Sequence, residues 1–536
     1  MPGKQVMLGP EARAAMKEGV DLLTKAVRVT MGPKGRNVVI EKRFAKPLIA
    51  HDGYTVANVV DNLEDPFANI GALIAYQATK QTNTSAGDGT STATILTQAI
   101  YSEGLRVVTA GMNAMMLRRG MEKAGAAVVE YLAAKATGIE NEEQLRWVAS
   151  VSAADEDLGA MIARVLHKLG KDGGVNIEDG QTNNVEIDFV NGLTFDRGYV
   201  SPYFAGTADD SEAALDHPHV LITDQKLSSS ADVLPLLEEF VQAGHRSLLI
   251  IAEDIEGEAL GLLVLNRVRG TLDVVAVKAP AFGERRRWML EDYAIFTGAK
   301  LAAKEMGVGW DAIDLSYLGQ LDGATIRKDE TVLVRGHGDS DAIKRRIESI
   351  WDTHGRAKND YDREKLSERA NNLAGSVGVI RVGAPTEIEQ KELKHRVEDA
   401  VSAARAALEE GFITGGGVSL IRAEAAIDAL DLQADELVGA NIVRNALAQP
   451  LMQIAENAGE DGEVVAVKVR EAKGSVGFNV ISGEYEDLVA AGIIDPVKVT
   501  RLAVTNAVSS AIMLLTTETL VVDAPEEKPA EHGHSH

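Results

Sequence analysis

The sequence predicts a multi-domain chain of mixed α+β and α/β character, with a mostly helical domain formed by both ends and an α/β domain inserted between them. At 536 residues, the chain is long enough for several domains. Helical periodicity broken by glycine loops covers the first 140 residues or so and returns after Pro385. Between them, β-rich runs alternate with helical segments, as in βαβ units. Such an insertion needs two chain crossings, for which Gly192 and Gly375 are candidate hinges.

The N-terminal region contains a series of expected helices. In Pro10–Thr30 the apolar residues recur close to every 3.6 positions, which predicts an amphipathic helix. A loop, TMGPKGRN, and a short strand, NVVIE, follow. Further helices are expected from Pro66 to just before SAGDGTSTAT, directly after that loop, and over roughly Asn113–Ala136. The methionines near the start of the last helix are expected to fill core space rather than to form a cofactor site.

The pattern changes near residue 185, where VEIDFVNGLTF alternates like a strand. The runs HVLITD, SLLIIAEDI and DVVAVKAP are short strands separated by helical stretches, so the segment to about Val382 forms an α/β domain of its own. Thr386 and Glu389 are spaced as a capping box for the helix that follows, and Gly411 supplies its end. The tail after Asp523 is polar and is expected to be disordered.

Composition excludes several classes of function. Acidic residues outnumber basic ones, 80 to 55, and a net charge of −25 opposes general nucleic-acid binding and attachment to anionic membranes. There is no cysteine, which removes disulfides, thiolate nucleophiles and zinc–thiolate sites and fits a reducing compartment. The N-terminus lacks the apolar region of a signal peptide, and no uninterrupted apolar run is long enough to span a membrane. We therefore expect a cytoplasmic protein.

The clearest candidate for a binding site is the loop Gly87–Thr92, which enters a helix. Glycines before a helix expose unpaired backbone N–H groups at its positive end, where phosphate oxygens bind. The hydroxyls of Thr90, Ser91 and Thr92 add donors, and Asp88 would tolerate a phosphate if Mg²⁺ lay between them. The alternative is an ordinary N-cap, for which Asp or Thr is common.

Two further glycine loops are ambiguous. Thr30–Asn37 follows a helix and does not match a Walker loop, so a helix end with a tight turn is the preferred local interpretation. Gly415–Gly417 requires something close to the backbone, which is either a ligand or another helix.

Two aspartates are candidates for positioning or deprotonating a water molecule. Asp52 precedes Gly53 in a turn, where Asp is common for structural reasons alone. Asp399 projects almost opposite the apolar stripe of the 386–410 helix, so locally it resembles a solvated surface charge. A role in function would require a ligand or another domain to cover that face.

The inserted domain carries leucines and a valine on two helical segments, which form either ordinary core or an exposed apolar groove for partner chains. These residues are Leu234, Leu237, Leu260, Val264 and Leu265. Three histidines in the tail, His532, His534 and His536, form at best a weak metal site.

Taken together and in order, the motifs closely resemble those of the group I chaperonin family, the 60-kDa ring-forming subunits, from about residue 5 to 523. The motifs are TMGPKGRNVVI, HDG, AGDGTSTAT, FDRGYVSPYF, IIAEDIEGEAL, VKAPAFGERR, DYDREKLSER, RVEDAVSAARAALEEG, TGGGVSLIR, EYEDLVAAGIIDP and KVTR. The resemblance implies an equatorial ATPase domain (1–136 and 411–523), an intermediate domain (137–191 and 376–410), an apical domain (192–375) and a tail (524–536). It also implies a homo-oligomer of seven-membered rings, usually two back to back, that folds non-native polypeptides under a co-chaperonin lid. ATP and Mg²⁺ are the implied cofactors, with K⁺ a further candidate.

The resemblance also implies roles for individual residues. Asp52 and Asp399 would activate water, Asp88 would bind the metal, and Asp495 would meet the ribose. The implied nucleotide-binding residues are Thr30, Met31, Gly32, Pro33, His51, Gly53, Asp88, Gly89, Thr90, Ser91, Thr92, Gly416, Asn479, Val480, Ile481 and Asp495. The implied surface for client and lid is Tyr199, Tyr203, Phe204, Leu234, Leu237, Leu260, Val264 and Leu265.

Some positions depart from the family pattern. His51 stands where Lys is usual, Ser91 replaces Thr, Ser376 replaces one glycine of a hinge pair, and the tail lacks Gly-Gly-Met repeats. These departures leave two alternatives beside an ATP-driven folding chamber. One is a specialised paralogue that acts as an ATPase-poor holdase or interaction protein with altered assembly. The other is an unrelated Mg-ATP transferase that uses the same loops.

Overall fold

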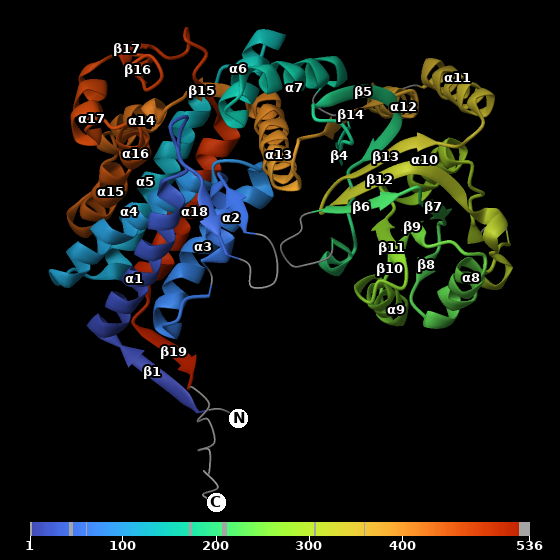
Figure 1. Cartoon of the computed structure of the whole chain (residues 1–536), viewed down its shortest axis with the longest axis horizontal. Helices are drawn as coiled ribbons and strands as arrows, with labels where there is room; N and C mark the ends of the chain where they lie inside the picture. The colour runs from blue at the N-terminus through green and yellow to red at the C-terminus, as the bar shows by residue number, and fades with distance from the viewer. Residues whose placement is uncertain are drawn as a thin grey trace, which may run out of the picture. The chain divides into compact units, whose positions relative to one another are not determined.

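A computed structural model describes residues 3–41, 47–60, 62–170, 174–205, 212–304, 307–357 and 360–524. Its internal contacts divide the chain into two compact units (Figure 1). Unit 1 comprises residues 1–171, 181–184 and 383–536, and therefore joins both ends of the chain. Unit 2 comprises residues 172–180 and 185–382. The tail expected to be disordered lies almost entirely outside the described residues, as do the three tail histidines.

Five long helices form the core of unit 1: α1 (Gly9–Arg28), α3 (Pro66–Ala86), α4 (Thr90–Thr109), α5 (Ala114–Ala134) and α18 (Val497–Thr516). The predicted periodicity of the first helix holds, because Ala12, Met16, Val20, Leu23 and Val27 are all completely buried in one cluster. Helix α18 packs against α3, α4 and α5, so residues near the C-terminus complete a core begun by the first hundred residues.

Glycines allow α1 and α3 to cross at backbone contact. A Cβ atom on Gly19 would lie 1.8 Å from the carbonyl oxygen of Ala68, and one on Gly71 would lie 2.2 Å from that of Met16. No larger side chain fits at either position without separating the two helices. This close approach suits a chain with few aromatic residues and many alanines and glycines.

The remaining helices of unit 1 surround the core or lead into it. They are α2 (Gly53–Val59), α6 (Glu142–Ala153), α7 (Glu156–Leu169), α13 (Glu387–Glu410), α14 (Val418–Asp428), α15 (Ala434–Ala446), α16 (Gln449–Asn457) and α17 (Gly462–Glu471). Helix α13 begins as predicted, because the Thr386 hydroxyl accepts the N–H of Glu389, and it ends at Gly411. It packs against α6, α7 and α18.

The described residues of unit 1 include four two-stranded antiparallel sheets, of which two join segments far apart in the sequence. Strand β1 (Lys4–Leu8) pairs with β19 (Thr519–Asp523), and β2 (Val38–Ile40) pairs with β3 (Leu48–Ala50). Strand β15 (Phe412–Thr414) pairs with β18 (Ile494–Pro496), and β16 (Val476–Asn479) pairs with β17 (Glu484–Asp487). The β15–β18 pair brings the loop after α13 beside the start of α18.

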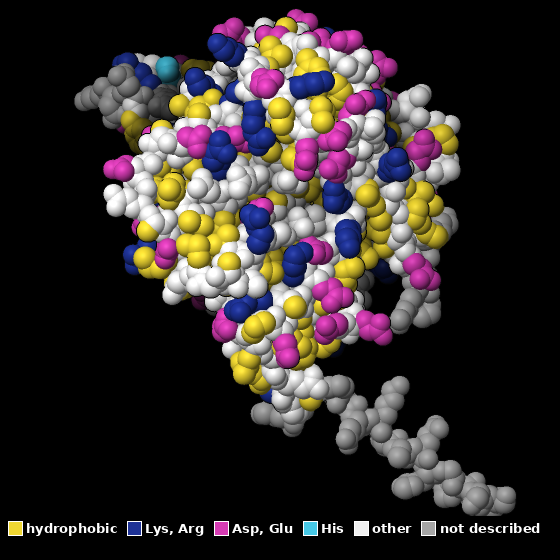
Figure 2. All heavy atoms as spheres, turned by 90° about the vertical axis from the view of Figure 1, so that its left-hand side faces the viewer, with side chains coloured by type: hydrophobic (Ala, Val, Ile, Leu, Met, Phe, Trp, Pro, Cys, Tyr) yellow, Lys and Arg dark blue, Asp and Glu magenta, His cyan; other side chains and the backbone are white. Residues whose placement is uncertain are grey.

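Helix α18 is the one helix in the described part of the chain that is long and apolar enough to cross a membrane. However, 61% of its most apolar window is buried inside unit 1. Length and composition alone are weak evidence, because a core helix of a soluble protein has the same properties. Figure 2 shows one face of the molecule on which Lys and Arg side chains alternate with Asp and Glu in small groups, so the acidic excess forms no continuous patch there.

Unit 2 is built on a nine-stranded mixed sheet with the order β11-β9-β7-β12-β13-β5-β14-β4, with β6 also pairing with β12. The strands are β4 (Val175–Asp179), β5 (Glu186–Phe195), β6 (Glu212–Asp216), β7 (His219–Ile222), β9 (Ser247–Ala252), β11 (Asp273–Lys278), β12 (Gly319–Arg327), β13 (Thr331–Gly336) and β14 (Ser376–Val382). A separate pair joins β8 (Lys226–Leu227) to β10 (Asp254–Ile255). The predicted βαβ pattern corresponds to β7, β9 and β11, which are parallel neighbours.

The helices of unit 2 are α8 (Ser230–Gln242), α9 (Gly257–Val268), α10 (Gly283–Thr297), α11 (Ser340–Arg356) and α12 (Asp360–Leu373), with short 3₁₀ turns at Pro202–Ala205, Trp310–Ala312 and Leu315–Tyr317. Gly192 and Gly375, the two candidate hinges, lie side by side within this unit, and the N–H of Gly192 donates to the carbonyl of Gly375 at 3.4 Å. The chain crosses between the compact units elsewhere, near residues 171–185 and 382–383.

Candidate functional site

A cavity of about 800 Å³ lies within unit 1, a size typical of small-molecule sites. Its walls come from segments far apart in the sequence: the loops before α2 and α4, helix α6, the middle of α13, the loop before α14, and the segments 478–481 and 491–496. All the sequence-predicted catalytic and nucleotide-binding residues line this cavity. The structure therefore brings together residues that spacing alone could not connect.

The loop before α4 leaves the first turn of that helix open to a ligand. Gly87 and Gly89 adopt left-handed conformations, with φ of 70° and 81°, so a side chain at either position would be strained. Gly89 is the N-cap of α4, and no side chain caps the helix. The alternative of an ordinary Asp or Thr cap is therefore wrong here, and the first N–H groups of α4 remain available for an anion.

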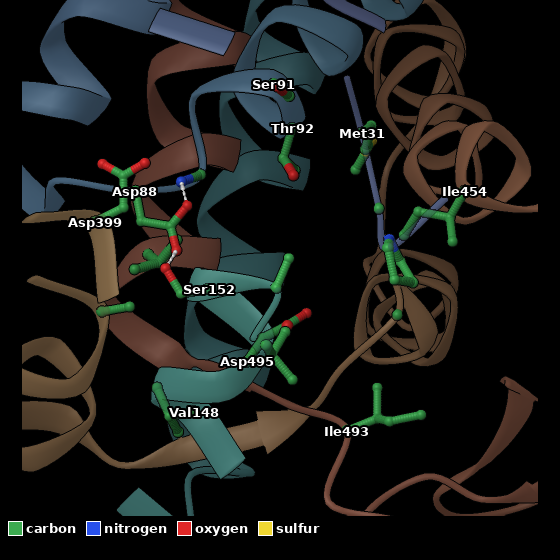
Figure 3. A pocket seen from close by; sticks show the side chains of 18 of the residues that line it. Met31, Asp88, Ser91, Thr92, Val148, Ser152, Asp399, Ile454, Ile493 and Asp495 are labelled. Atoms are coloured by element: carbon green, nitrogen blue, oxygen red, sulfur yellow. Dashed lines mark hydrogen bonds between the residues drawn. The ribbon is translucent and has the colours of Figure 1, made fainter. Parts of the chain in front are cut away.

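The side chain of Asp88 is held by two hydrogen bonds. Its carboxylate accepts the backbone N–H of Gly89 at 2.5 Å and the hydroxyl of Ser152, on α6, at 2.9 Å (Figure 3). Burial raises the pKa of Asp88, the two hydrogen bonds lower it, and the charge of Asp52 raises it further, with a net upward shift. The carboxylate is thus held in one orientation.

Asp52 serves as the N-cap of α2. Its two carboxylate oxygens accept the N–H groups of Tyr54 at 2.9 Å and Thr55 at 2.7 Å. The next residue, Gly53, lies against the start of α4, since a Cβ atom there would be 2.2 Å from the Ser91 hydroxyl oxygen. The turn interpretation of Asp52 is therefore correct, and the same residue also faces the cavity.

Asp399 is not the solvated surface charge that its position on α13 suggested. It lies in the cavity beside Asp88 (Figure 3). Burial raises the pKa of Asp399 well above its usual value, and the charges of Asp52, Asp88 and Glu398 raise it further. The local argument failed because the helix face opposite the apolar stripe is covered by other parts of unit 1.

Asp495 adds another carboxyl group to the cavity. Burial, followed by the charge of Asp88, raises the pKa of Asp495 to about 7. The oxygen Oδ1 of Asp495 also lies 3.0 Å from the position of a Cβ on Gly415, so it is packed directly against the glycine loop. Asp155, Glu156 and Glu392 also line the cavity. So many carboxyl groups form a region that disfavours additional negative charge and favours protons or cations.

The loop after α1 forms another wall. The preferred interpretation as a helix end is correct, since α1 ends at Arg28 and Gly32 turns the chain with φ of 81°. The same loop also lines the cavity, where Met31 and Ile454 lie near each other (Figure 3). The Thr30 hydroxyl lies 3.3 Å from that of Ser91, which joins this loop to the start of α4.

The loop Gly415–Gly417 packs closely against protein atoms and also borders the cavity. Gly416 and Gly417 have φ of 62° and 77°, and a Cβ on Gly417 would lie 2.9 Å from the backbone nitrogen of Leu451. The alternative of another helix close to the backbone is therefore correct, and the loop also borders the cavity. Val480 is buried, whereas Ile481 is exposed beside it and Asn479 uses its side-chain oxygen to accept the Ile481 N–H at 2.9 Å.

Sequence reasoning missed several residues of this site. Ser152 and His395 face the cavity from α6 and α13, and Ile454 covers Gly32. Ser152 and Ile454 belong to no local motif, so nothing in the sequence marks them. His395 stands one helical turn before Asp399, which is a signal that could have been used once Asp399 was singled out.

The predicted client surface in unit 2 is only partly exposed. Tyr203, Leu234 and Leu265 are exposed, whereas Tyr199, Leu260 and Val264 are half-buried against the core. Phe204 and Leu237 are buried in the main core of the unit, so the expectation that they form a surface is wrong for this structure. The turn 202–205 and helix α8 pack onto the sheet, which buries the side chains of Phe204 and Leu237.

The cavity suits a cation that is coordinated partly by the protein and partly by a bound substrate and water. Among the described residues, no group of three or more acidic, histidine or cysteine side chains is close enough to hold a metal by itself. Mg²⁺ is commonly held by one or two carboxylates together with substrate phosphates and water. The oriented Asp88, without a basic partner among its hydrogen bonds, fits that arrangement.

Comparison with known proteins is consistent with these features. The model of the TCP-1/cpn60 chaperonin family matches residues 23–525, and the chain belongs to this family. Among solved structures, the chain is similar to the chaperonin gp146 from bacteriophage EL of Pseudomonas aeruginosa, crystallised in the presence of ATP-BeFx. The TM-score is 0.68 and the identity 22%, over 97% of this chain and 99% of the other. The helix-rich mixed fold is thus the chaperonin fold, and the resemblance to group I chaperonins is confirmed.

Proposed function

We propose that this chaperonin is an ATP-driven folding machine and that the cavity of unit 1 binds and hydrolyses Mg-ATP. The observation that supports this most strongly is the convergence of three glycine loops and the carboxyl groups of Asp52, Asp88, Asp399 and Asp495 on one cavity of about 800 Å³. Open N–H groups at the start of α4 suit phosphate oxygens, and Val480 and Ile481 offer apolar contacts for a base.

Each side chain has a role that follows from its position. Asp88 would hold Mg²⁺, which when bound offsets the negative charge of the phosphates. Thr90, Ser91 and Thr92 would donate to phosphate oxygens, and Asp495 would accept a ribose hydroxyl. Asp52 and Asp399 would orient the attacking water and accept its proton, a role for which two carboxylates of different environment are suited.

The raised pKa of Asp399 is compatible with this role once a ligand is present. In the unliganded protein, burial and the charges of Asp52 and Asp88 favour its protonated form. A bound cation lowers the pKa of nearby carboxyl groups and so favours the ionised form that can act as a base. Nucleotide binding would thus prepare the group that hydrolysis needs.

Unit 2 would bind non-native polypeptides and a small co-chaperonin lid through the exposed residues Tyr203, Leu234 and Leu265. Exposed apolar side chains on a soluble protein commonly mark such interaction sites. We further propose assembly into seven-membered rings, stacked as fourteen subunits, in the cytoplasm. ATP binding would favour the state in which this surface is hidden, which requires a higher ATP affinity in that state.

The experiment combines negative-stain electron microscopy, with and without ATP, with phosphate release and refolding of a denatured test protein. The proposal requires rings, ATP hydrolysis that depends on Mg²⁺, and refolding that depends on ATP. Capture of the denatured protein without phosphate release would instead identify a holdase. Phosphorylation of a small acceptor molecule by single subunits would identify a transferase.

A further inference from the structure

His395 introduces an ionisable base into an otherwise acidic cavity. It lies on α13, one helical turn before Asp399, and lines the same cavity wall. The charged or ionisable groups that surround this cavity on the packed elements are Asp52, Asp88, Arg146, Asp155, Glu156, Glu392, Arg396, Glu398, Asp399, Asp495 and His51. Acidic groups dominate, so the few basic ones decide whether an anionic ligand can bind.

The other basic groups of the cavity contact protein partners, although the Nε atom of Arg396 is buried without one. The Arg396 guanidinium donates to Glu392 at 2.8 Å and to the carbonyl of Ala153 at 3.5 Å. Arg146 lies 3.7 Å from Glu143. The ring atom Nδ1 of His51 lies 3.1 Å from the side-chain oxygen of Asn37. Each of these bases therefore has a protein partner.

The surroundings of His395 favour its cationic form. Its Nδ1 lies 3.4 Å from a carboxylate oxygen of Glu398, the residue three positions along the same helix. This hydrogen bond is the largest influence, and it raises the pKa of His395. Burial and the charge of Lys394 lower the pKa, whereas the charges of Glu398 and Asp52 raise it. The net result is a pKa above the usual value of 6.5. Because Glu398 holds Nδ1, the other ring nitrogen, Nε2, remains as a second donor in the imidazolium form.

We propose that His395 is a pH-dependent cation that contacts the terminal phosphate of a nucleotide bound in this cavity. The proposal rests on the proposed ATP site, and it adds a residue and a regulatory property to that site. The imidazolium donates from Nε2 to a phosphate oxygen and offsets part of the acidic field of Asp52 and Asp399. Deprotonation removes both the charge and, at Nε2, the donor, so ATP affinity falls as the pH rises through the raised pKa of His395.

A purely structural role gives a different expectation. His395 and Glu398 could be an ordinary surface pair on α13, since the side chain of His395 is 52% exposed. In that case, substitution would change the melting temperature only slightly, as is typical of such pairs. Nucleotide affinity and its pH dependence would not change.

The test measures the dissociation constants of ATP and ADP by calorimetry between pH 6 and 9, in the wild-type protein and in His395→Gln and His395→Arg. At pH 6.5 the Gln variant should bind ATP about five- to tenfold more weakly than wild type, the size expected for loss of a charged hydrogen-bond partner. The Arg variant should bind tightly at both ends of the range. ADP, which lacks the terminal phosphate, should respond less than ATP.

Glu398→Gln provides a matched control on the same helix. It removes the group that raises the pKa of His395, so the loss of ATP affinity should move to lower pH without disappearing. His167→Gln, at an exposed position on α7 outside the cavity, should leave the difference between pH 6.5 and pH 8.5 in place. A variant His395→Gln with the affinity and pH dependence of the wild type would overturn the inference. Absence of nucleotide binding in the wild type would instead overturn the proposed function.

Discussion

The hydroxyl of Ser152 donates a hydrogen bond of 2.9 Å to the carboxylate of Asp88, which joins α6 to the loop before α4 across 64 residues of sequence. Substitution of Ser152 by Ala removes this bond and leaves Asp88 held by Gly89 alone. We expect Mg-ATP to bind about fivefold more weakly, the effect of losing roughly 1 kcal/mol. Calorimetry measures the affinity, and Ser150→Ala on the same helix is the control. Equal affinity in both variants would show that Ser152 does not orient Asp88.

Gly53 and Ser91 allow a second test of how the cavity is built. In Gly53→Ala the new Cβ would lie 2.2 Å from the Ser91 hydroxyl oxygen, so either the Ser91 side chain or the two helices must shift. Overpacking of this kind costs about 1–3 kcal/mol. Thermal unfolding should show a lower melting temperature and calorimetry a weaker nucleotide affinity. The double variant Gly53→Ala/Ser91→Ala removes the clashing atom and should recover stability, and additive effects of the two substitutions would contradict this explanation.

Asp399→Ala tests the proposed chemistry separately from binding. The substitution removes a carboxyl group whose neighbours Asp52 and Asp88 repel its charge, so binding of ATP should be retained or strengthened. Steady-state hydrolysis should fall about 100-fold or more, the usual contribution of a general base. Phosphate release measures turnover, and nucleotide affinity confirms an intact site. Turnover at the wild-type rate would exclude this residue as the base.

Asp495 predicts how the stability of the nucleotide-free protein depends on pH. Its pKa is raised from about 4 in the unfolded chain to about 7 in the folded protein, so the folded state binds an extra proton between these values. Stability from this group is therefore fully present below pH 4 and is lost as the pH rises to 7. Between pH 5 and pH 8, the melting temperature of Asp495→Asn should fall less than that of the wild type. Asp431→Asn, at an exposed position, should behave like the wild type.

Variants in the partly exposed surface of unit 2 test the binding of denatured protein separately from the stability of the fold. Tyr203→Ser and Leu265→Ser remove exposed side chains, so they should leave the melting temperature nearly unchanged and reduce capture of a denatured test protein. Phe204→Ala, at a completely buried position, should cost about 3–5 kcal/mol of stability. Light scattering during dilution of the denatured protein measures capture. Unchanged capture by both serine variants would place the client surface elsewhere.

Helices and glycine loops were predictable because their signals are local. The period of apolar residues in α1 fixes which face is buried, and the glycines before α4 mark a turn that other residues do not adopt. The insertion of one α/β unit between two helical halves followed from the change of pattern near residue 185. The order of the nine-stranded sheet did not follow, since pairing between distant strands leaves little trace in one sequence.

The site was less predictable because its parts come from different segments. Asp399 looked like a surface charge because the sequence of one helix does not show which other segments pack against each of its faces. Ser152 belongs to no recognisable sequence motif, and only its hydrogen bond to Asp88 connects it with the site. Phe204 and Leu237 lie beside exposed residues in the sequence, yet α8 and the 202–205 turn direct them into the core. The family resemblance identified the cavity residues, whereas local chemistry alone left each one ambiguous.

The pairing of β1 with β19 determines the order in which the chain can reach its folded state during translation. Strand β19 and helix α18 leave the ribosome after all of unit 2, so the core of the terminal unit waits for the last few dozen residues. Unit 2, whose strands lie in one stretch interrupted only briefly, can fold while synthesis continues. A nascent polypeptide therefore carries all of unit 2 before it has the last segments that line the cavity of unit 1.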